Sequence, residues 1–174
     1  MTRILLALAI TLLLASCASA SVPHAFEAKG FSPAEVQALQ QAAAQWTAAG
    51  HPTIITTEYC EDCSVIRSVS RIQLCTHVAG ITRCEDAPST ALASTQYDSG
   101  TSDTPSATAD HYEISILAHR GESQEWYEHR GASDNLDYVH LLALHELGHT
   151  WGRGHAGPGS VMSPYIHEMG RVID

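Results

Sequence analysis

The sequence predicts an α+β fold whose elements follow an α/β-like order. Two segments, one near each end of the chain, have apolar residues at helical spacing, and the stretches between them alternate or are rich in β-branched residues. A length of 174 residues suits one domain and is short for two. We therefore expect one folded domain over residues 31–174, in the order helix, several strands, helix and a short C-terminal part.

The composition narrows the class of protein and its partners. Hydrophobic residues make up 44% of the chain and charged residues 16%, which is typical of a globular protein and not of a disordered one. The formal net charge is −10, and Lys and Arg form no cluster. Nucleic acids and anionic membrane surfaces attract basic proteins, so both are poor partners here. We expect a monomer that binds no nucleic acid.

The first residues have the pattern of an export signal. MTR carries one positive charge, and the apolar run ILLALAITLLLAS that follows it is too short to span a bilayer. The motif LASC at residues 14–17 resembles a bacterial lipobox, which makes residues 1–16 a lipoprotein signal peptide and Cys17 the lipidated first residue. The small residues 18–20 offer another cleavage site, which would release a soluble secreted protein. We expect residues 17–30 to tether the domain by this lipid to the bacterial cell envelope, in the outer membrane, facing the periplasm or the exterior.

The first helix has clear start and stop signals. Ser32 is a good N-cap, Pro33 suits the first helical position, and Glu35 completes a capping box. Gly50 ends the segment. The apolar face of this helix consists of Val36, Leu39, Ala43 and Trp46.

Strand patterns follow the first helix. They cover residues 52–58, residues 64–77 as a long strand or a bent pair, residues 81–84, and residues 111–119. Residues 85–110 have low complexity and are expected to form a long surface loop or lid. Calcium is a candidate ligand for this loop through Asp98, Asp103 and Asp110, although these aspartates lack the spacing of a known calcium loop.

The cysteines predict two disulfides. With the lipobox cysteine set aside, four remain, and an exported chain is expected to pair them. Residues 71–84 have the pattern of a hairpin with residues 79–80 as its turn, and a two-residue turn places Cys75 directly opposite Cys84. We therefore predict Cys75–Cys84 and, by elimination, Cys60–Cys63. A four-cysteine zinc knuckle is the alternative, because C-x2-C is also a metal-ligand spacing.

The last helix starts near Asp134 or Asn135, either of which can cap it, and runs through LDYVHLLALHELGHTW. Its expected buried stripe consists of Leu136, Val139, Leu142, Ala143 and Leu147.

The segment HELGHTWGRGH, residues 145–155, carries a candidate metal site at the end of that helix. His145 and His149 are four residues apart, so their side chains lie on one helix face, which suits two imidazoles at about 2.0–2.1 Å from one zinc ion. Gly152 permits the chain to turn off the helix and bring His155 back as a third ligand. Three protein ligands leave a fourth position for water, as in catalytic zinc sites.

Glu146 stands beside the first ligand, where its carboxylate can reach that water without binding the metal. Zinc lowers the pKa of a bound water to about 7, so a nearby carboxylate can take its proton at neutral pH and later pass it to a leaving amine. The chemistry indicated is metal-assisted hydrolysis of an amide bond.

The chain continues as HAGPGSVMSPY, with Met162 seven residues after the third histidine. H-E-x-x-H-x-x-G-x-x-H followed by such a methionine resembles the metzincin zinc peptidases, closest to the matrixin-like branch, over residues 145–165. The resemblance implies a twisted mixed sheet, mostly parallel, packed on an N-terminal helix and an active-site helix, with an edge strand that pairs with extended substrate. The roles it implies are zinc ligation by His145, His149 and His155, catalysis by Glu146, and an apolar base beneath the site from Met162.

We therefore expect a zinc-dependent endopeptidase with Glu146 as general base and a protein or peptide as substrate. Tyr165 is a candidate to hydrogen-bond a zinc ligand or the oxyanion. His111 and His119 are candidates for a second, structural zinc, although the aspartate pattern that accompanies such a site is missing. The alternative function is a non-catalytic zinc-binding surface lipoprotein used for adhesion or protein recognition.

Overall fold

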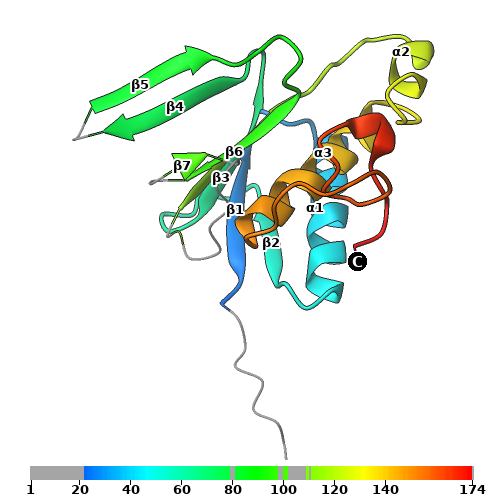
Figure 1. Cartoon of the computed structure of the whole chain (residues 1–174). Helices are drawn as coiled ribbons and strands as arrows, with labels where there is room; N and C mark the ends of the chain where they lie inside the picture. Colours follow the sequence, from blue (N-terminus) through cyan, green and yellow to red (C-terminus); the bar gives the residue numbers. More distant parts are fainter. Residues whose placement is uncertain (1–21, 79–80, 98–99, 102–108, 110, 174) are drawn as a thin grey trace, which may run out of the picture.

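The computed structural model describes residues 22–78, 81–97, 100–101, 109 and 111–173, and it shows a mixed α+β fold (Figure 1). The signal peptide, Cys17 and the aspartates considered for calcium lie outside the described residues. Within the described part, no helix is long and apolar enough to cross a bilayer. The elements are β1 (His24–Lys29), α1 (Pro33–Ala48), β2 (Thr53–Thr56), β3 (Ser64–Val69), β4 (Gln73–Val78), β5 (Ile81–Asp86), β6 (Ala93–Tyr97), β7 (Gly100–Thr101), β8 (Tyr112–Leu117), α2 (Gln124–Glu128), α3 (Asn135–Thr150) and the 3-10 turn η1 (Ile166–Glu168).

A six-stranded mixed sheet in the order β2-β1-β3-β8-β6-β7 forms the centre of the fold. The pairs β1–β2, β1–β3 and β3–β8 are parallel, whereas β6 runs antiparallel to β8. The short β7 pairs only with Gln96 and Tyr97. Within the described residues, the first half of β6 therefore has no ladder partner on its outer side.

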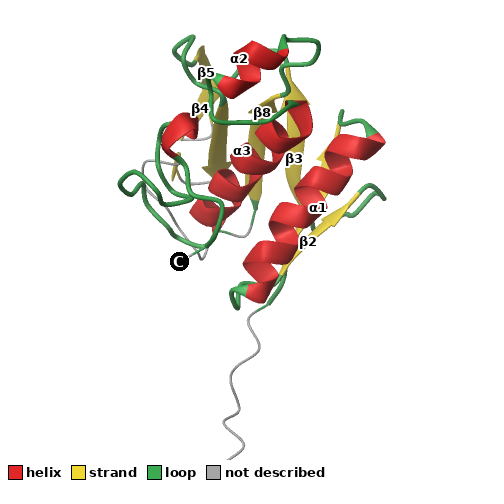
Figure 2. Ribbon diagram, turned by 90° about the vertical axis from the view of Figure 1, so that its right-hand side faces the viewer, coloured by secondary structure: helices red, strands yellow, loops and turns green. Residues whose placement is uncertain are grey.

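Helices α1 and α3 lie side by side on one face of the sheet (Figure 2). The capping box of Ser32 and Glu35 and the proline at the start of α1 are present as predicted, and the whole predicted apolar face of α1 is buried. Trp46 joins the two helices, because its Nε1 donates to the Leu144 carbonyl at 2.9 Å. In α3 the predicted stripe is buried except for Leu136, which is 41% exposed because it lies in the first turn, at the end of the helix.

Two assignments made from the sequence are wrong. Residues 24–29 are part of the sheet and not of a tether, since β1 pairs with both β2 and β3 and its Phe26 is fully buried. Residues 85–110 are not one long loop, because β5 extends to Asp86 and the segment supplies β6 and β7. Strands β6 and β7 are short and polar, so they are stabilised by pairing with neighbouring strands and not by their own composition. The ambiguous stretch 64–77 is a bent pair, β3 and β4.

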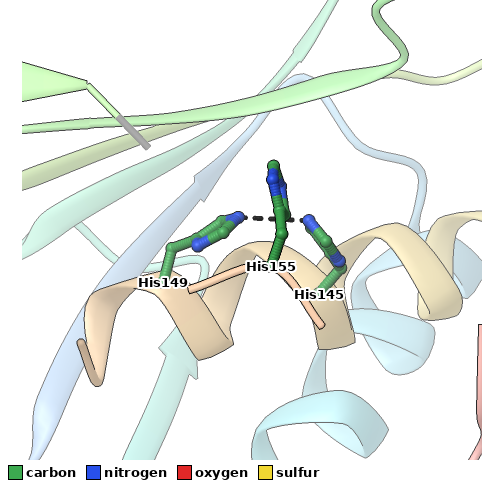
Figure 3. A group of neighbouring side chains, drawn as sticks. All are labelled: His145, His149 and His155. Atoms are coloured by element: carbon green, nitrogen blue, oxygen red, sulfur yellow. Dashed lines mark hydrogen bonds between the residues drawn. The ribbon is translucent and has the colours of Figure 1, made fainter. Parts of the chain in front are cut away.

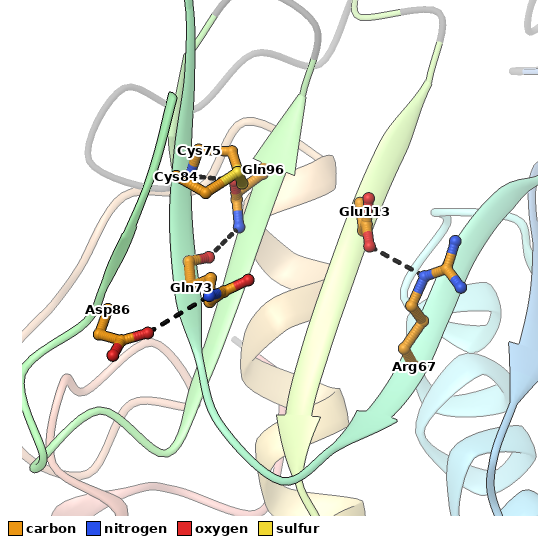
Figure 4. The surroundings of a disulfide bond; sticks show 7 residues. All are labelled: Arg67, Gln73, Cys75, Cys84, Asp86, Gln96 and Glu113. Carbon is orange, nitrogen blue, oxygen red and sulfur yellow. Dashed lines mark hydrogen bonds and ion pairs between the residues drawn. A yellow bond between two sulfur atoms is a disulfide. The ribbon is translucent and has the colours of Figure 1, made fainter. Parts of the chain in front are cut away.

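Both predicted disulfides are present, which leaves the four cysteines unavailable for a zinc knuckle. Cys75 and Cys84 are directly opposite in the antiparallel hairpin β4–β5, with a Cα–Cα distance of 4.0 Å, and Cys60 is bonded to Cys63. Figure 4 shows how the hairpin is attached to the sheet. The Gln96 side chain accepts from the Cys75 amide at 2.8 Å and donates to the Gln73 carbonyl at 2.6 Å.

The buried carboxylate of Glu35 links three parts of the fold. Arg120, which follows β8, donates to Glu35 Oε1 at 2.8 Å and Oε2 at 2.6 Å, and Asn135 at the start of α3 donates to Oε1 at 3.0 Å. Burial raises the pKa of the Glu35 carboxyl, but the hydrogen bonds from Arg120, Ser32 and Asn135 outweigh it and lower the pKa to about 2.

Replacing Glu35 by Gln is expected to lower the free energy of unfolding at pH 7. A shift in pKa from 4.5 to about 2 corresponds to about 3 kcal/mol. Because the folded-state pKa is the lower one, this stabilisation is complete above about pH 5 and is lost as the pH falls toward 2. Urea unfolding of both proteins across this pH range measures the difference. Glu113→Gln, which breaks an exposed pair with Arg67, is the control and is expected to cost under about 0.5 kcal/mol. A difference between wild type and Glu35→Gln that does not change with pH would contradict this account.

Candidate metal centre and catalytic site

Helix α3 and the turn after it position the three predicted zinc ligands. His145 and His149 lie one helical turn apart and are 7% and 2% exposed. Gly152 has a φ of 74° and donates its amide to the His149 carbonyl at 2.9 Å, which ends the helix and reverses the chain. This reversal brings the His155 side chain beside those of His145 and His149, as the spacing predicts.

The three imidazoles converge on one point (Figure 3). One ligand nitrogen from each of His145, His149 and His155 lies within 4.8 Å of the others, and within the described part of the chain this is the one group of three or more potential metal ligands. The Nε2 atoms of His145 and His149 are 3.1 Å apart. Two nitrogens bound to one tetrahedral zinc ion are about 3.3 Å apart, so this spacing fits a shared zinc.

Backbone carbonyls fix which ring nitrogen of His145 and of His149 faces the other imidazoles. His145 Nδ1 lies 3.0 Å from the Val161 carbonyl oxygen, and His149 Nδ1 lies 2.8 Å from that of Arg153. A carbonyl only accepts, so each Nδ1 carries the ring proton and each Nε2 presents a lone pair. Two lone pairs that face each other at 3.1 Å repel, and a cation between them removes the repulsion.

The electrostatic surroundings keep His145 neutral. Burial is the main cause that lowers the pKa of its imidazole to about 3; His149 and His155 act in the same direction, and the Val161 carbonyl opposes the change. A neutral imidazole is the form that binds a metal.

Glu146 lies in the same cavity as the three histidines. This cavity has a volume of about 180 Å³, and residues 90–93, which lead into β6, form one wall. Glu146 is 4% exposed, and Thr95 of β6 donates its hydroxyl to Glu146 Oε2, at a distance of 2.6 Å. Burial outweighs the opposing hydrogen bond from Thr95 and raises the pKa of the Glu146 carboxyl to about 7.

Met162 packs against α3 at Gly148. It is 3% exposed, and its backbone carbonyl accepts from the Ala156 amide at 2.9 Å, which ties the turn after His155 to the segment that carries the methionine. A Cβ on Gly148, which lies between the two helical ligands, would approach Met162 Sδ to 2.3 Å and Trp46 Cζ2 to 2.9 Å. The close packing at this point explains the glycine in HELGH.

Gly148→Ala is expected to lower the free energy of unfolding by about 1–3 kcal/mol, because the Trp46 ring is held by its bond to Leu144 and cannot move aside. Thermal or urea unfolding measures the change. Gly157→Ala is the matched control, because a Cβ there meets nothing within 4 Å. Equal stabilities of the two variants would show that the methionine does not pack tightly on the helix.

Other candidate residues lie away from the triad. Tyr165 is 60% exposed and lines the neighbouring cavity, so the structure does not bring it among the zinc candidates. His119 packs against Trp126 at a centroid distance of 4.7 Å, and His111 is exposed in a cavity at the β3–β8 side of the sheet. The structure therefore does not bring His111 and His119 into a second group of three ligands within its described residues.

Thr95 is the site residue that the sequence did not reveal. It belongs to a stretch of small polar residues, LASTQY, that has the composition of a loop. The alternation Ala93, Thr95, Tyr97 is the only local signal that one face of this segment is buried.

No protein-family model matches the chain, and no curated protein is similar enough to count as a relative.

Proposed function

We propose that the protein is a zinc-dependent endopeptidase of the metzincin type. The observation that carries the proposal is the arrangement of His145 and His149, whose Nδ1 atoms are held by carbonyls and whose Nε2 atoms are 3.1 Å apart beside the His155 imidazole. Three imidazoles at this spacing match the donor set and geometry of a catalytic zinc site.

A zinc ion held there supplies a water of lowered pKa and a Lewis acid for the carbonyl of a peptide bond. Glu146 takes a proton from the attacking water and passes it to the nitrogen of the leaving amine. Thr95 occupies Oε2 of this carboxylate, so Oε1 is the oxygen left for the water. The low polarity around Glu146 raises its affinity for the proton that it must hold between the two steps.

The order of the strands supports this assignment. The antiparallel β6 lies next to the ligand helix, and its outer edge over residues 93–95 carries no ladder partner within the described residues. An extended peptide can add to such an edge by main-chain hydrogen bonds. Residues 91–93 also line the cavity of the histidines, so a peptide bound on this edge passes in front of Glu146.

A non-catalytic zinc-binding protein is the competing function, and the position of Glu146 argues against it. A site that only binds zinc needs no buried carboxylate in the same cavity. Incubation of the zinc-loaded protein with unfolded casein and a peptide library, with and without a chelator, separates the two. Chelator-sensitive cleavage supports the endopeptidase, and zinc binding without any cleavage supports the binding protein.

Export to the bacterial cell envelope with a lipid on Cys17 is part of the proposal, and the two disulfides support an oxidising compartment. Mass spectrometry of the mature chain tests it. A lipidated Cys17 at the N-terminus is expected, and an unlipidated start at Ser21 would contradict the anchor.

Thr95→Val is expected to reduce kcat about 10-fold or more with little change in KM, because the Glu146 carboxylate loses the donor that fixes its orientation. Thr95→Ser keeps the hydroxyl and is expected to restore most of the rate. Steady-state kinetics on one peptide, with zinc content measured in each variant, checks this. A rate for Thr95→Val equal to that of Thr95→Ser would exclude a positioning role for the hydroxyl.

A further inference from the structure

A second cavity continues the one that holds the histidines. It has a volume of about 240 Å³ and shares four lining residues with the first. The shared residues are Thr90, Leu92, Pro164 and Ile166. The two cavities are therefore adjacent, and a peptide chain bound at the histidines has the second cavity beside it.

The second cavity is lined by three basic side chains and by no carboxylate among the described residues. Arg130 and His129 come from the end of α2, and His167 comes from η1. These two segments are packed together, since a Cβ on Gly131 would lie 3.0 Å from His167 Cα. The Glu168 carboxylate lies 3.9 Å from His167 Nε2, and it does not line the cavity.

The charge of Arg130 is balanced differently from that of four other arginines. Arg67, Arg71, Arg120 and Arg171 each pair with a carboxylate. Arg130 has no such pair within the described residues. Its guanidinium lies over the Trp126 ring at 3.7 Å and donates to the Trp126 carbonyl at 3.3 Å. The aromatic ring holds the cation in place and leaves its charge unneutralised.

We propose that this cavity is a substrate subsite that binds a carboxylate of the peptide, with Arg130 as its main determinant and His129 and His167 beside it. A guanidinium fixed in advance binds a carboxylate through paired hydrogen bonds at little entropic cost. In a chain with a net charge of −10, a local basic cavity also makes acidic peptides bind where the rest of the surface repels them. The subsite rests on the proposed peptidase function. The carboxylate is supplied either by an Asp or Glu side chain or by the C-terminus of a short peptide.

Two sets of fluorescent peptides test the subsite. Both are built on a sequence that the wild-type enzyme cleaves or, failing cleavage, binds. In one set Glu or Gln is placed at each of three positions on either side of the central bond, and in the other the peptide ends in a free carboxylate or an amide. Wild type is expected to favour the acidic member about 10-fold in kcat/KM at one position or at the C-terminus, with a preference that weakens as salt is added. The first set detects a side-chain carboxylate and the second a terminal one.

Variants of Arg130 decide whether the cavity is responsible. Arg130→Met keeps an apolar stem against Trp126 and is expected to abolish the preference, so that the Glu and Gln peptides are cleaved at equal rates. Arg130→Glu is expected to transfer the preference to a peptide with Lys at the same position. Arg67→Met removes one positive charge, as Arg130→Met does, but from the distant strand β3. It is expected to keep the wild-type preference. An acidic preference that persists in both Arg130 variants, or no acidic preference in wild type, overturns the proposal.

Peptide binding to zinc-loaded Glu146→Ala, measured by fluorescence anisotropy, separates the subsite from the catalytic function. A 10-fold weaker binding of the Gln or amide peptide than of its acidic partner supports the subsite even if no peptide is cleaved. Cleavage by wild type without such a difference in binding or in rate leaves the peptidase proposal intact and excludes the subsite.

Discussion

Glu146→Ala is expected to reduce kcat for peptide hydrolysis by about 10³-fold or more while one zinc ion stays bound. The carboxylate is the only acidic group that lines the cavity with the three histidines among the described residues, so no neighbour can replace it as the base. Loss of a positioned general base alone costs about 10²–10⁴ in rate. Zinc is retained because the imidazoles and the carbonyls that orient them are unchanged.

Glu146→Gln is the stricter form of this experiment. Glutamine keeps the size of the side chain and can still bond with Thr95, but it cannot take a proton at neutral pH. Zinc content by atomic absorption and cleavage of an internally quenched peptide are measured on the same samples. Glu113→Gln, at an exposed position that faces away from the core, serves as the control (Figure 4). More than a tenth of the wild-type rate in zinc-loaded Glu146→Gln would rule out Glu146 as the base.

His149→Ala is expected to abolish both zinc binding and hydrolysis. His149 is 2% exposed and its ring is fixed by the Arg153 carbonyl, so its loss removes one of three ligands and opens a polar gap that a side chain cannot refill. Since replacing a group that only orients a ligand costs about 10–100-fold in metal affinity, loss of the ligand itself is expected to cost more. Equilibrium dialysis with a zinc indicator measures the affinity.

His140→Ala is the matched control for the ligand variant. His140 lies on the same helix, but it contacts α1, with Nε2 3.1 Å from Gln45 Nε2 and Nδ1 3.2 Å from the Ala38 carbonyl oxygen. This variant is expected to lose some stability and to keep zinc and activity. Equal zinc affinities of the two variants would mean that the metal binds elsewhere.

The features that could be predicted from the sequence are those set by local spacing. His145 and His149 share a helix face by their separation, Gly152 reverses the chain within six residues, and Ser32 caps α1 with Glu35 three positions on. The pairing of Cys75 with Cys84 likewise follows from the register of the β4–β5 hairpin, in which Val78 is opposite Ile81. Each of these depends on a few neighbouring residues, whose conformations physical chemistry restricts strongly.

The features that the sequence did not reveal depend on contacts between distant segments. β1 is a strand because β2 and β3 pair with both of its edges, although its sequence HAFEAK has one strongly apolar residue. β6 is a strand because β8 lies beside it, and only that pairing brings Thr95 to Glu146, 51 positions along the chain. The cavity of Arg130 similarly forms where α2 meets the segment after Met162. No local pattern distinguishes such residues from those of a polar loop.

The central claim is that His145, His149 and His155 hold one zinc ion that acts with Glu146 in peptide hydrolysis. The most direct test is to remove all metal from the wild-type protein and to follow peptide cleavage as zinc is added back in known amounts. We expect no cleavage without metal and a rate that rises linearly with added zinc and stops rising at one zinc per chain. Cleavage by the metal-free protein, or a fully zinc-loaded protein that cleaves no peptide, would contradict this claim.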